Sequence, residues 1–509
     1  MKSKLSNGLR MILIVVGILT LGAPDIDAAT NTNAALPHPS AGPVCTVDDD
    51  GDADYTTIQE AVDDAACDTI TVAEGDYTEG TVIARSLTLI GAGADETSVN
   101  STTQAFVINN TSASVAISDL SIVSNIGSGE GIGIYNTGML TLTGVILASN
   151  EGDLGAGIYN TGNLTVIDSA IIGNLALSGR GAGIYNLGEM TLLDSVIEGN
   201  YAGLAGGIYN AYGCQVAISN SVIQDNQAAS AGGIYNSGDM IISDSQILDN
   251  LAAEESYSNG GGIYNDLGKL TIADSVIQGN SATYFGGGIY LDNHAEMWMT
   301  GCSVNSNSAS DGGGIYNSRA GAYVSIAVSE ISANMASDSG GGLYTDDVVL
   351  VEGSSIFDNT AGADGGGIQV GSSGVLTLTN VTVSGNSANG NGGGIALLGD
   401  VYLNSVTIAN NTADADANDD GGGGGVYESG SVTVVNTIIG ANADNSPKTE
   451  HPDCSGSFTS SGYNLVRDAS GCTGFTGTGD LKGSVLSPLE PHLLTLDDYG
   501  GWTPTHALR

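Results

Sequence analysis

The sequence predicts an all-β protein, a right-handed parallel β-helix in which short strands stack coil upon coil. The tripeptide Gly-Ile-Tyr recurs from Ile134 to Ile315, with degenerate copies as far as Val426, at a regular spacing. A repeat period within about 20 to 50 residues is typical of a solenoid. Each copy opens three short apolar–polar alternations separated by turns, and its Gly and β-branched residues oppose a helical repeat.

Residues 1–28 predict a secretory signal. A basic start precedes a short apolar run, Met11 to Ala23, and Ala28 offers a cleavage point. The run is short for a membrane span, although an uncleaved N-terminal anchor is the alternative. Residues 29–43 form a linker of small residues and Pro. We therefore expect a bacterial protein that is secreted or held at the cell surface or outer membrane, with no transmembrane span in the mature chain.

Residues 44–130 predict an N-terminal cap followed by the first coils. Thr57 can cap a short helix whose apolar face is Ile58, Ala61, Val62 and Ala65. Residues 69–72 and 86–90 alternate as strands. A helix laid over the first coil would cover the open end of the core, as solenoids require.

Export makes disulfides possible, and the chain has six cysteines. Two pairs close short loops and are predicted to be bridged: Cys45 with Cys67, and Cys454 with Cys472.

The other two cysteines, Cys214 and Cys302, are three repeats apart. At about 4.8 Å per stacked strand that is about 14 Å, whereas a disulfide needs Cα atoms within about 7 Å. We expect buried free thiols at positions that Leu164 or Ser195 hold in other copies.

Residues 131–445 form the repeats, and Ala156 to Asn174 shows one clearly, with three short strands and three turns. Stacking makes columns of like residues. An asparagine ladder is predicted, in which each amide donates to the next coil; it comprises Asn150, Asn174, Asn200, Asn226, Asn250 and Asn280, and continues through Asn307, Asn334, Asn359 and Asn386. A tyrosine column is predicted beside it, either to stabilise the stack or to face a glycan; it comprises Tyr159, Tyr185, Tyr209, Tyr235 and Tyr264, with Tyr135, Tyr290, Tyr316 and Tyr344.

Two stretches carry a family resemblance. Gly-Gly-Gly-Ile-Tyr followed by Val-Ile-x-Gly-Asn, over about 131–442, resembles the repeat of chlamydial polymorphic outer-membrane proteins, with Ile often in place of their Phe. Residues 446–509, with Asp453-Cys454, Ser461 to Val466 and Gly500 to Leu508, are similar to a truncated bacterial choice-of-anchor Q domain. The resemblance implies a pectin-lyase-like β-helix that is secreted or surface-bound.

Many parallel β-helices degrade polysaccharides, so a catalytic role is one candidate. A lyase needs a base beside carboxylates, yet between 131 and 445 the basic residues are Arg180, Lys269, His294 and Arg319, spread over separate coils or turns. No coil breaks the repeat with a new polar cluster, which an active site usually requires. We expect a non-catalytic, adhesin-like or structural protein. The alternatives are a polysaccharide lyase or glycoside hydrolase, which needs only two carboxylates, and a glycan-binding module.

Acidic loops offer the remaining candidate sites. The segment from Asp48 to Asp54 resembles part of a calcium loop but lacks its Gly and Glu, and a second acidic loop precedes Gly421. No cofactor is expected beyond weak calcium, with these candidate ligands: Asp48, Asp50, Asp52, Asp416 and Asp420.

The formal net charge of −45, from 11 basic and 56 acidic residues, argues against nucleic acid as a partner. We expect a monomer whose partner is an extracellular glycan or protein.

Overall fold

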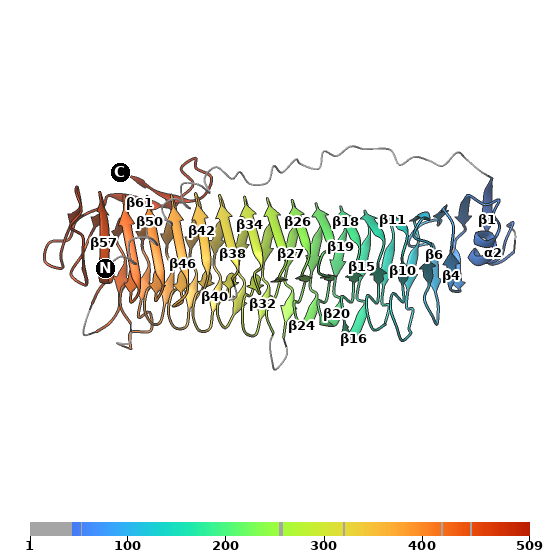
Figure 1. Ribbon diagram of the computed structural model, residues 1–509, viewed down its shortest axis with the longest axis horizontal. Coiled ribbons are helices and arrows are strands. Elements are labelled where there is room, and N and C mark those ends of the chain that lie inside the picture. The colour runs from blue at the N-terminus through green and yellow to red at the C-terminus, as the bar shows by residue number, and fades with distance from the viewer. Residues whose placement is uncertain (1–42, 52, 254–257, 319–320, 419–420, 448–449) are drawn as a thin grey trace, which may run out of the picture. The chain divides into compact units, whose positions relative to one another are not determined.

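The structure is a computed structural model that describes residues 43–509 except 52, 254–257, 319–320, 419–420 and 448–449. Residues 43–509 form one compact unit, a parallel β-solenoid of about 16 turns. Strands of successive coils lie side by side along the solenoid (Figure 1). The predicted all-β fold is confirmed. The signal segment and most of the predicted linker lie outside the described residues.

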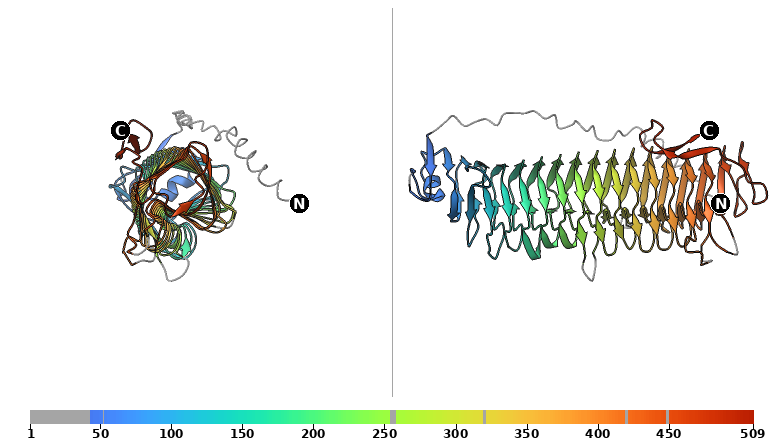
Figure 2. Two further views of the ribbon diagram at one scale, coloured as in Figure 1. Left: turned by 90° about the vertical axis from the view of Figure 1, so that its left-hand side faces the viewer. Right: turned by 180° about the vertical axis from the view of Figure 1, so that it is seen from behind.

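The N-terminal end of the core is covered by helix α2 (Ile58–Asp63). Its N-cap is Thr57, whose hydroxyl accepts a hydrogen bond from the Glu60 backbone N–H at 3.3 Å. Ile58, Ala61 and Val62 are buried, and the view along the solenoid shows the helix within the outline of the coils (Figure 2). Ala65 is exposed and follows the helix, so the expected apolar face ends at Val62.

One coil illustrates the local structure. The chain passes through β17 (Ile184–Asn186), β18 (Glu189–Leu193), β19 (Val196–Glu198) and β20 (Tyr201–Leu204) before β21 (Ile208–Asn210) starts the next coil. These strands belong to four stacks, which we call sheet C, sheet A, sheet B and sheet D in that order. Strands in each stack pair in parallel, with like residues in register, as Ile184 with Ile208 shows.

The fourth stack corrects the prediction of three strands per coil. Sheet D runs from β16 (Leu175–Arg180) to β56 (Ala443–Asp444), and many of its strands are very short. Such short strands hold a single inward alanine, as Ala282 and Ala361 show. One small residue gives no alternation along the sequence, so the pattern did not reveal the strand.

The core is filled by inward aliphatic residues from sheets A, B and C. In the longer strands of sheet A the second and fourth residues are buried, as Met190 and Leu192 are in β18. The outward residues alternate with them, so one face of each sheet meets the core and the other meets solvent. This alternation places every candidate functional side chain on an outer face or in a turn.

Both predicted disulfides are confirmed, Cys45–Cys67 and Cys454–Cys472, each with Cα atoms 5.5 Å apart. Cys302 and Cys214 are free. Cys302 is buried in the row that holds Ser195, as expected, and its backbone N–H donates to the next residue of that row, Ser329, at 3.1 Å. Cys214 differs from expectation. It is half-buried in the turn before sheet A, because Val216 takes the inward position opposite Met190.

The two free thiols are therefore expected to differ in reactivity. Burial raises the pKa of Cys302 to about 11, and burial also raises the pKa of Cys214. In the native protein Cys214 should alkylate slowly at alkaline pH because it is half-exposed, whereas Cys302 should react only after unfolding. Peptide mass mapping after native and denaturing alkylation checks this, and native labelling of Cys302 would contradict its placement.

The chain ends in a hairpin laid on the outer face of sheet B. Strands β61 (Leu493–Asp497) and β62 (Thr505–Leu508) pair antiparallel and lie beside the C-terminal coils (Figure 1). Polar contacts attach the hairpin: Thr382 and Thr505 hydroxyls meet at 2.9 Å, and His506 Nε2 lies 2.8 Å from the Ser384 hydroxyl. In the described part of the chain, no helix has both the length and the apolar character to cross a bilayer.

Candidate functional site

The predicted asparagines lie in one buried row at the turn after sheet B. In each, the side-chain amide donates to the side-chain oxygen of the next, as Asn200 Nδ2 does to Asn226 Oδ1 at 2.9 Å. Asn200 Nδ2 also donates to the Ile171 carbonyl at 3.0 Å. The row ends at the buried carboxylate of Asp453, which accepts from Asn442 Nδ2 at 3.1 Å. These residues hold the coils together and are closed to a ligand.

Sequence reasoning missed a second amide row, the asparagine of each Ile-Tyr-Asn. Asn136 Nδ2 donates to Asn160 Oδ1 at 2.8 Å, and the row continues coil by coil to Asn265. Leu291 then interrupts it. The signal in the sequence was the Asn that directly follows most tyrosines of the column, on the strand that carries them.

The tyrosine column lies on the outer side of sheet C, with little ring face free. Neighbouring rings from Tyr135 to Tyr235 are stacked, with centroids 4.7–5.3 Å apart. Tyr159, Tyr209 and Tyr290 are buried, and the other rings are half-buried. Burial, ahead of the nearby Glu130 carboxylate, raises the pKa of Tyr159 to about 12. A sugar ring therefore finds edges and hydroxyls here rather than an open aromatic platform.

Two carboxylates accept hydrogen bonds from tyrosine hydroxyls partway along this column. They belong to the last residues of β29 (Ile263–Asp266) and β33 (Ile289–Asp292). Asp266 and Asp292 are partners on adjacent strands. The Tyr235 hydroxyl donates to Asp266 Oδ2 and the Tyr264 hydroxyl to Asp292 Oδ2 at 3.4 Å. Asn293 Nδ2 donates to Asp266 Oδ1 at 2.8 Å. Burial first, then the Asp266 contact, raises the pKa of Tyr235.

In each of several successive coils, the sheet A strand that comes after the tyrosine strand begins with a polar residue, and these residues form a row. We call it the polar row. Its members are register partners from strand to strand, and all are exposed except half-buried Glu296. It spans about 24 Å at about 4.8 Å per strand. It comprises Asn163 of β14 (Asn163–Ile167), Glu189 of β18, Gln215 of β22 (Gln215–Ser219), Asp239 of β26 (Asp239–Ser243), Lys269 of β30 (Lys269–Ala273) and Glu296 of β34 (Glu296–Thr300).

An aromatic pair stands at the C-terminal end of the polar row. Tyr323, the first residue of β38 (Tyr323–Ala327), is the register partner of Glu296. Trp298 of β34 points outward, because Met297 and Met299 on either side of it are buried. The two ring centroids are 6.2 Å apart. Both rings are half-buried, and burial raises the pKa of Tyr323.

Trp298 breaks a column that carries small or aliphatic residues on the other coils, apart from Tyr402. Its register partners are Thr271 and Ser325, and Thr165 and Thr191 hold the same place on earlier coils. The expectation that no coil breaks the repeat with a new polar cluster is wrong at the Asp266–Asp292 pair, and Trp298 adds an aromatic departure. Aligning the copies by their strand register, rather than by Gly-Ile-Tyr alone, would have exposed both Trp298 and the Asp266–Asp292 pair.

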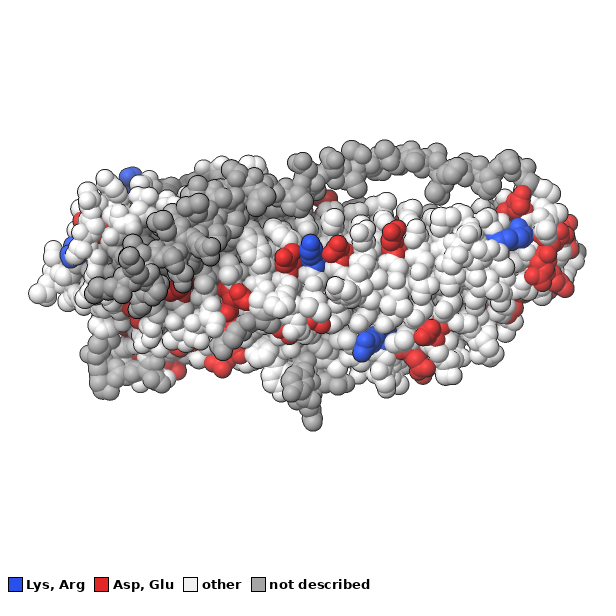
Figure 3. All heavy atoms as spheres, in the orientation of Figure 1, with Lys and Arg blue, Asp and Glu red and all other residues white. Residues whose placement is uncertain are grey.

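A shallow cavity of about 260 Å³ opens beside the other end of the polar row. Asn163, Glu189 and Gln215 line it from sheet A, and Cys214 lines it from the preceding turn. Most of the face that contains the middle coils carries neither acidic nor basic side chains (Figure 3). The polar row itself carries three carboxylates and one ammonium group beside its two amides, so it offers both charged and neutral hydrogen-bonding groups.

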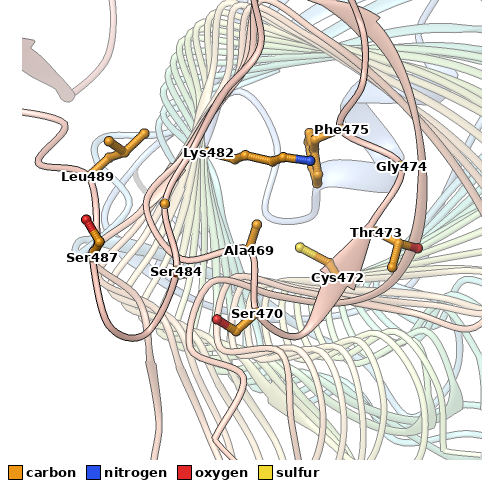
Figure 4. A pocket seen from close by; sticks show the side chains of 11 residues that line it. Ala469, Ser470, Cys472, Thr473, Gly474, Phe475, Lys482, Ser484, Ser487 and Leu489 are labelled. Carbon is orange, nitrogen blue, oxygen red and sulfur yellow. The ribbon is translucent and has the colours of Figure 1, made fainter.

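A larger cavity of about 370 Å³ lies at the C-terminal end of the solenoid. Cys472, Phe475 and Leu489 line it, and the Lys482 side chain extends across it toward Phe475 (Figure 4). No carboxylate stands beside Lys482 among the lining residues, so this cavity lacks the base and acid pair that polysaccharide cleavage requires.

The expected calcium loops are only partly described. Asp48 Oδ1 accepts the Asp50 backbone N–H at 3.2 Å, and Asp416 Oδ2 accepts from Asn418 Nδ2 at 3.0 Å. Within the described residues no group of three or more His, Cys, Asp or Glu side chains is arranged to hold a metal ion. Asp52 and Asp420 lie outside the described residues, so calcium binding stays a prediction.

The solved structures to which the chain is similar include enzymes. The chain is similar to the catalytic unit of a thermostable GH87 α-1,3-glucanase from Streptomyces thermodiastaticus, at 16% identity and a TM-score of 0.36, over 76% of this chain and 64% of that one, just under two thirds of its length. It is similar to a mannuronan C-5 epimerase A-module of Azotobacter vinelandii at 12% identity, TM-score 0.28, over 84% and 93%. Carrot pectin methylesterase matches at 12%, TM-score 0.20, over 78% and 90%. No curated protein sequence matches the chain.

The prediction that the chain is not an enzyme is wrong, because the observations behind it do not exclude catalysis. The fold is one that these polysaccharide-active enzymes share, so it gives no ground for excluding catalysis. The prediction rested on scattered basic residues and on a repeat without a new polar cluster, and the second of these grounds fails at the Asp266–Asp292 pair. At these identities the likeness shows the fold alone and assigns no substrate.

A family model settles the relationship at the level of the repeats. The model described as the right handed beta helix region matches residues 155–331 and 233–413, which together cover just over half of the chain. The finer resemblances, to chlamydial repeats and to a choice-of-anchor Q domain, stay predictions. With its parallel coils, in-register columns and amide rows, the chain belongs to the right-handed β-helix family.

Proposed function

We propose that this chain is an exported protein that binds a linear, uncharged polysaccharide along the polar row and against the Trp298–Tyr323 pair. The single observation that carries the proposal is the placement of an outward aromatic pair at the end of six in-register polar side chains. Aromatic faces pack on the apolar faces of sugar rings, while amides and carboxylates accept and donate hydrogen bonds to hydroxyls.

The spacing of the row favours a polymer over a small sugar. One polar side chain recurs on every coil from Asn163 to Glu296, parallel to the solenoid axis. A ligand that contacts the whole row must be extended along that axis for about 24 Å. The cavity beside Asn163 and the ring pair at Tyr323 would then hold the two ends of the bound stretch.

Charge favours a neutral polymer. The row contains three carboxylates and one ammonium group, Lys269, in a chain of net charge −45. A polyanion such as pectate or alginate would be repelled by this surface. The two disulfides support folding in an oxidising compartment, where extracellular glycans are available. Binding of this kind fits an adhesin-like role at the cell surface.

Trp298→Ala is expected to weaken the binding of neutral oligosaccharides by about tenfold or more, since truncating an aromatic anchor of a binding site costs about 2 kcal/mol. Isothermal titration with cello-, xylo- and β-1,3-gluco-oligosaccharides measures it. The matched control is Trp502→Ala, which removes the other tryptophan, 86% exposed on the C-terminal hairpin. Equal loss in both variants, or no binding of any neutral glycan by the wild type, would refute the site.

Hydrolysis is the second candidate function. Asp266 and Asp292 lie on adjacent strands, about 4.8 Å apart along the axis, close to the separation of the two carboxyl groups in retaining glycosidases. Reducing ends are therefore assayed on the same oligosaccharides. Turnover that disappears in Asp292→Asn while oligosaccharide binding persists would establish an enzyme, and binding without turnover would leave the polar row as a binding surface.

A further inference from the structure

The outer face of sheet B differs between the two halves of the solenoid. In the N-terminal half its outward residues are mainly aliphatic and half-buried, with Glu198 the one charged residue among the outward positions from 146 to 276. We call these aliphatic residues the apolar strip: Ile146 of β12 (Ile146–Ala148), Ala170 and Ile172 of β15 (Ala170–Ile172), Val196 of β19, Val222 of β23 (Val222–Gln224), Leu248 of β27 (Gln246–Leu248) and Val276 of β31 (Val276–Gln278).

In the C-terminal half the outward residues of sheet B are mainly small and polar, with Phe357 and Ile438 as larger apolar exceptions, and part of the face is occupied. Ser355 of β43 (Ser355–Phe357) and Thr382 and Ser384 of β47 (Thr382–Ser384) are buried under the β61–β62 hairpin. The Ser355 hydroxyl contacts the Thr503 hydroxyl at 3.0 Å, and the hairpin reaches as far as the Gly353 carbonyl. The chain thus shows that this face accepts an extended segment laid across its strands, and that the hairpin stops short of the apolar strip.

An acidic edge accompanies the apolar strip. The turn between sheets A and B carries exposed aspartates at one position of successive coils, all with positive φ. Asn220 and Gly144 hold the same position on neighbouring coils, so the turn itself does not require a carboxylate. Beyond Asp274 the position is held by Gly301, Val328, Gly353, Asn380, Ser405 and Asn436. The acidic edge comprises Asp119, Asp168, Asp194, Asp244 and Asp274.

Carboxylates one or two coils apart repel one another, which costs stability that asparagine would avoid. Four of the five aspartates nevertheless lie on coils that carry a residue of the apolar strip. Both patterns end at the coil of Asp274 and Val276, and strands β35 (Ser303–Asn305) and β39 (Glu330–Ser332) separate that coil from the one that the hairpin reaches at Ser355. The hairpin itself contributes Asp497 and Asp498, and it lies where the edge has no acidic residue. The edge thus carries no acidic residue where the face holds this acidic hairpin.

We propose that the apolar strip and the acidic edge together bind an extended, basic segment of another protein, with aliphatic residues toward the strip and Lys or Arg toward the edge. Apolar patches with polar rims mark protein interaction sites, and the cores of such interfaces are depleted of charge. A second copy of this chain fits poorly, because its own acidic edge and its net charge of −45 would face like charge.

The test uses the full chain and a labelled synthetic peptide that alternates leucine with lysine, with fluorescence anisotropy as the readout. Ile172→Asp with Val196→Asp is expected to weaken binding about tenfold. Asp168→Asn with Asp194→Asn should weaken binding and flatten its salt dependence, because fewer charges are paired. Asn220 shows that asparagine keeps the turn, and thermal unfolding confirms that both variants fold.

Matched controls separate this site from general attraction to an acidic chain. Ile241→Asp changes an aliphatic residue, 53% exposed, on the outer face of sheet A, and Glu189→Gln with Asp239→Asn removes two charges there. Neither should alter peptide affinity, and a peptide with its leucines and lysines in separate blocks should bind less tightly. The proposal is overturned if the sheet A variants lose as much affinity as the sheet B variants. It is also overturned if the wild type dimerises through this face and Ile172→Asp abolishes the dimer.

Discussion

Asn200→Leu should lower the unfolding midpoint of the solenoid more than any exposed substitution on the same coils. Asn200 is fully buried, and its side-chain oxygen accepts both the backbone N–H and the amide of Asn174, each at 2.9 Å. Leucine has a similar volume but no polar group, so these two donors and the Ile171 carbonyl lose their partner. Each buried polar group left unpaired costs about 1–3 kcal/mol of stability. Thermal and urea unfolding measure the loss.

Asn163→Leu is the matched control. It makes the same chemical change at an exposed position of the polar row, so it should leave the midpoint nearly unchanged. A solenoid can also unravel locally, because each coil contacts only its neighbours. Hydrogen exchange on peptides from the coils around Asn200 should therefore show lost protection in Asn200→Leu. Equal midpoints for the two variants would mean that the amide row adds nothing to stability.

The stability contributed by Asp453 is expected to fall as pH rises. Burial, opposed by hydrogen bonds from Asn442 and Asp468, raises the pKa of Asp453 from 3.8 to about 6. The native state therefore binds a proton more tightly than the unfolded chain does. Its contribution is fully present below about pH 4 and is lost as pH rises through about 6, a change of about 3 kcal/mol for a shift of this size.

Asp453→Asn removes this titration. The stability of the wild type relative to the variant should be greater at about pH 4.5 than at about pH 7.5, by about 2 kcal/mol from the same linkage. Asp480 provides a control of opposite sign. Burial raises its pKa, but hydrogen bonds from Ser460, Asn464 and Gly477 outweigh burial and hold the pKa below its usual value. Asp480→Asn should lose relative stability as pH rises, and an unaltered pH profile in Asp453→Asn would show that Asp453 stays ionised.

The sequence alone determined the fold, because every level of its pattern points the same way. A tripeptide repeated at a solenoid period, Gly at the corners and alternating β-branched residues are consistent with one architecture only. The positions of the Asn200 row, helix α2 and both cysteine pairs followed from the same reading of the chain. Sheet D did not, since a very short strand with one inward alanine leaves no periodic signal.

Only the tertiary structure decided which side chains are exposed to solvent and which side chains contact one another. The tyrosines look like a glycan platform in one dimension, yet from Tyr135 to Tyr235 each ring stacks on its neighbour, and Tyr264 meets its two neighbours edge to face. Trp298 and Tyr323 belong to successive repeats and gain meaning only because adjacent coils place their ring centroids 6.2 Å apart. The hairpin on sheet B joins parts of the chain that are distant in sequence, as Thr382 with Thr505 shows. The repeated sequence pattern specifies the coil. Residues that depart from the pattern can form a site only where the register of the parallel strands places them next to one another.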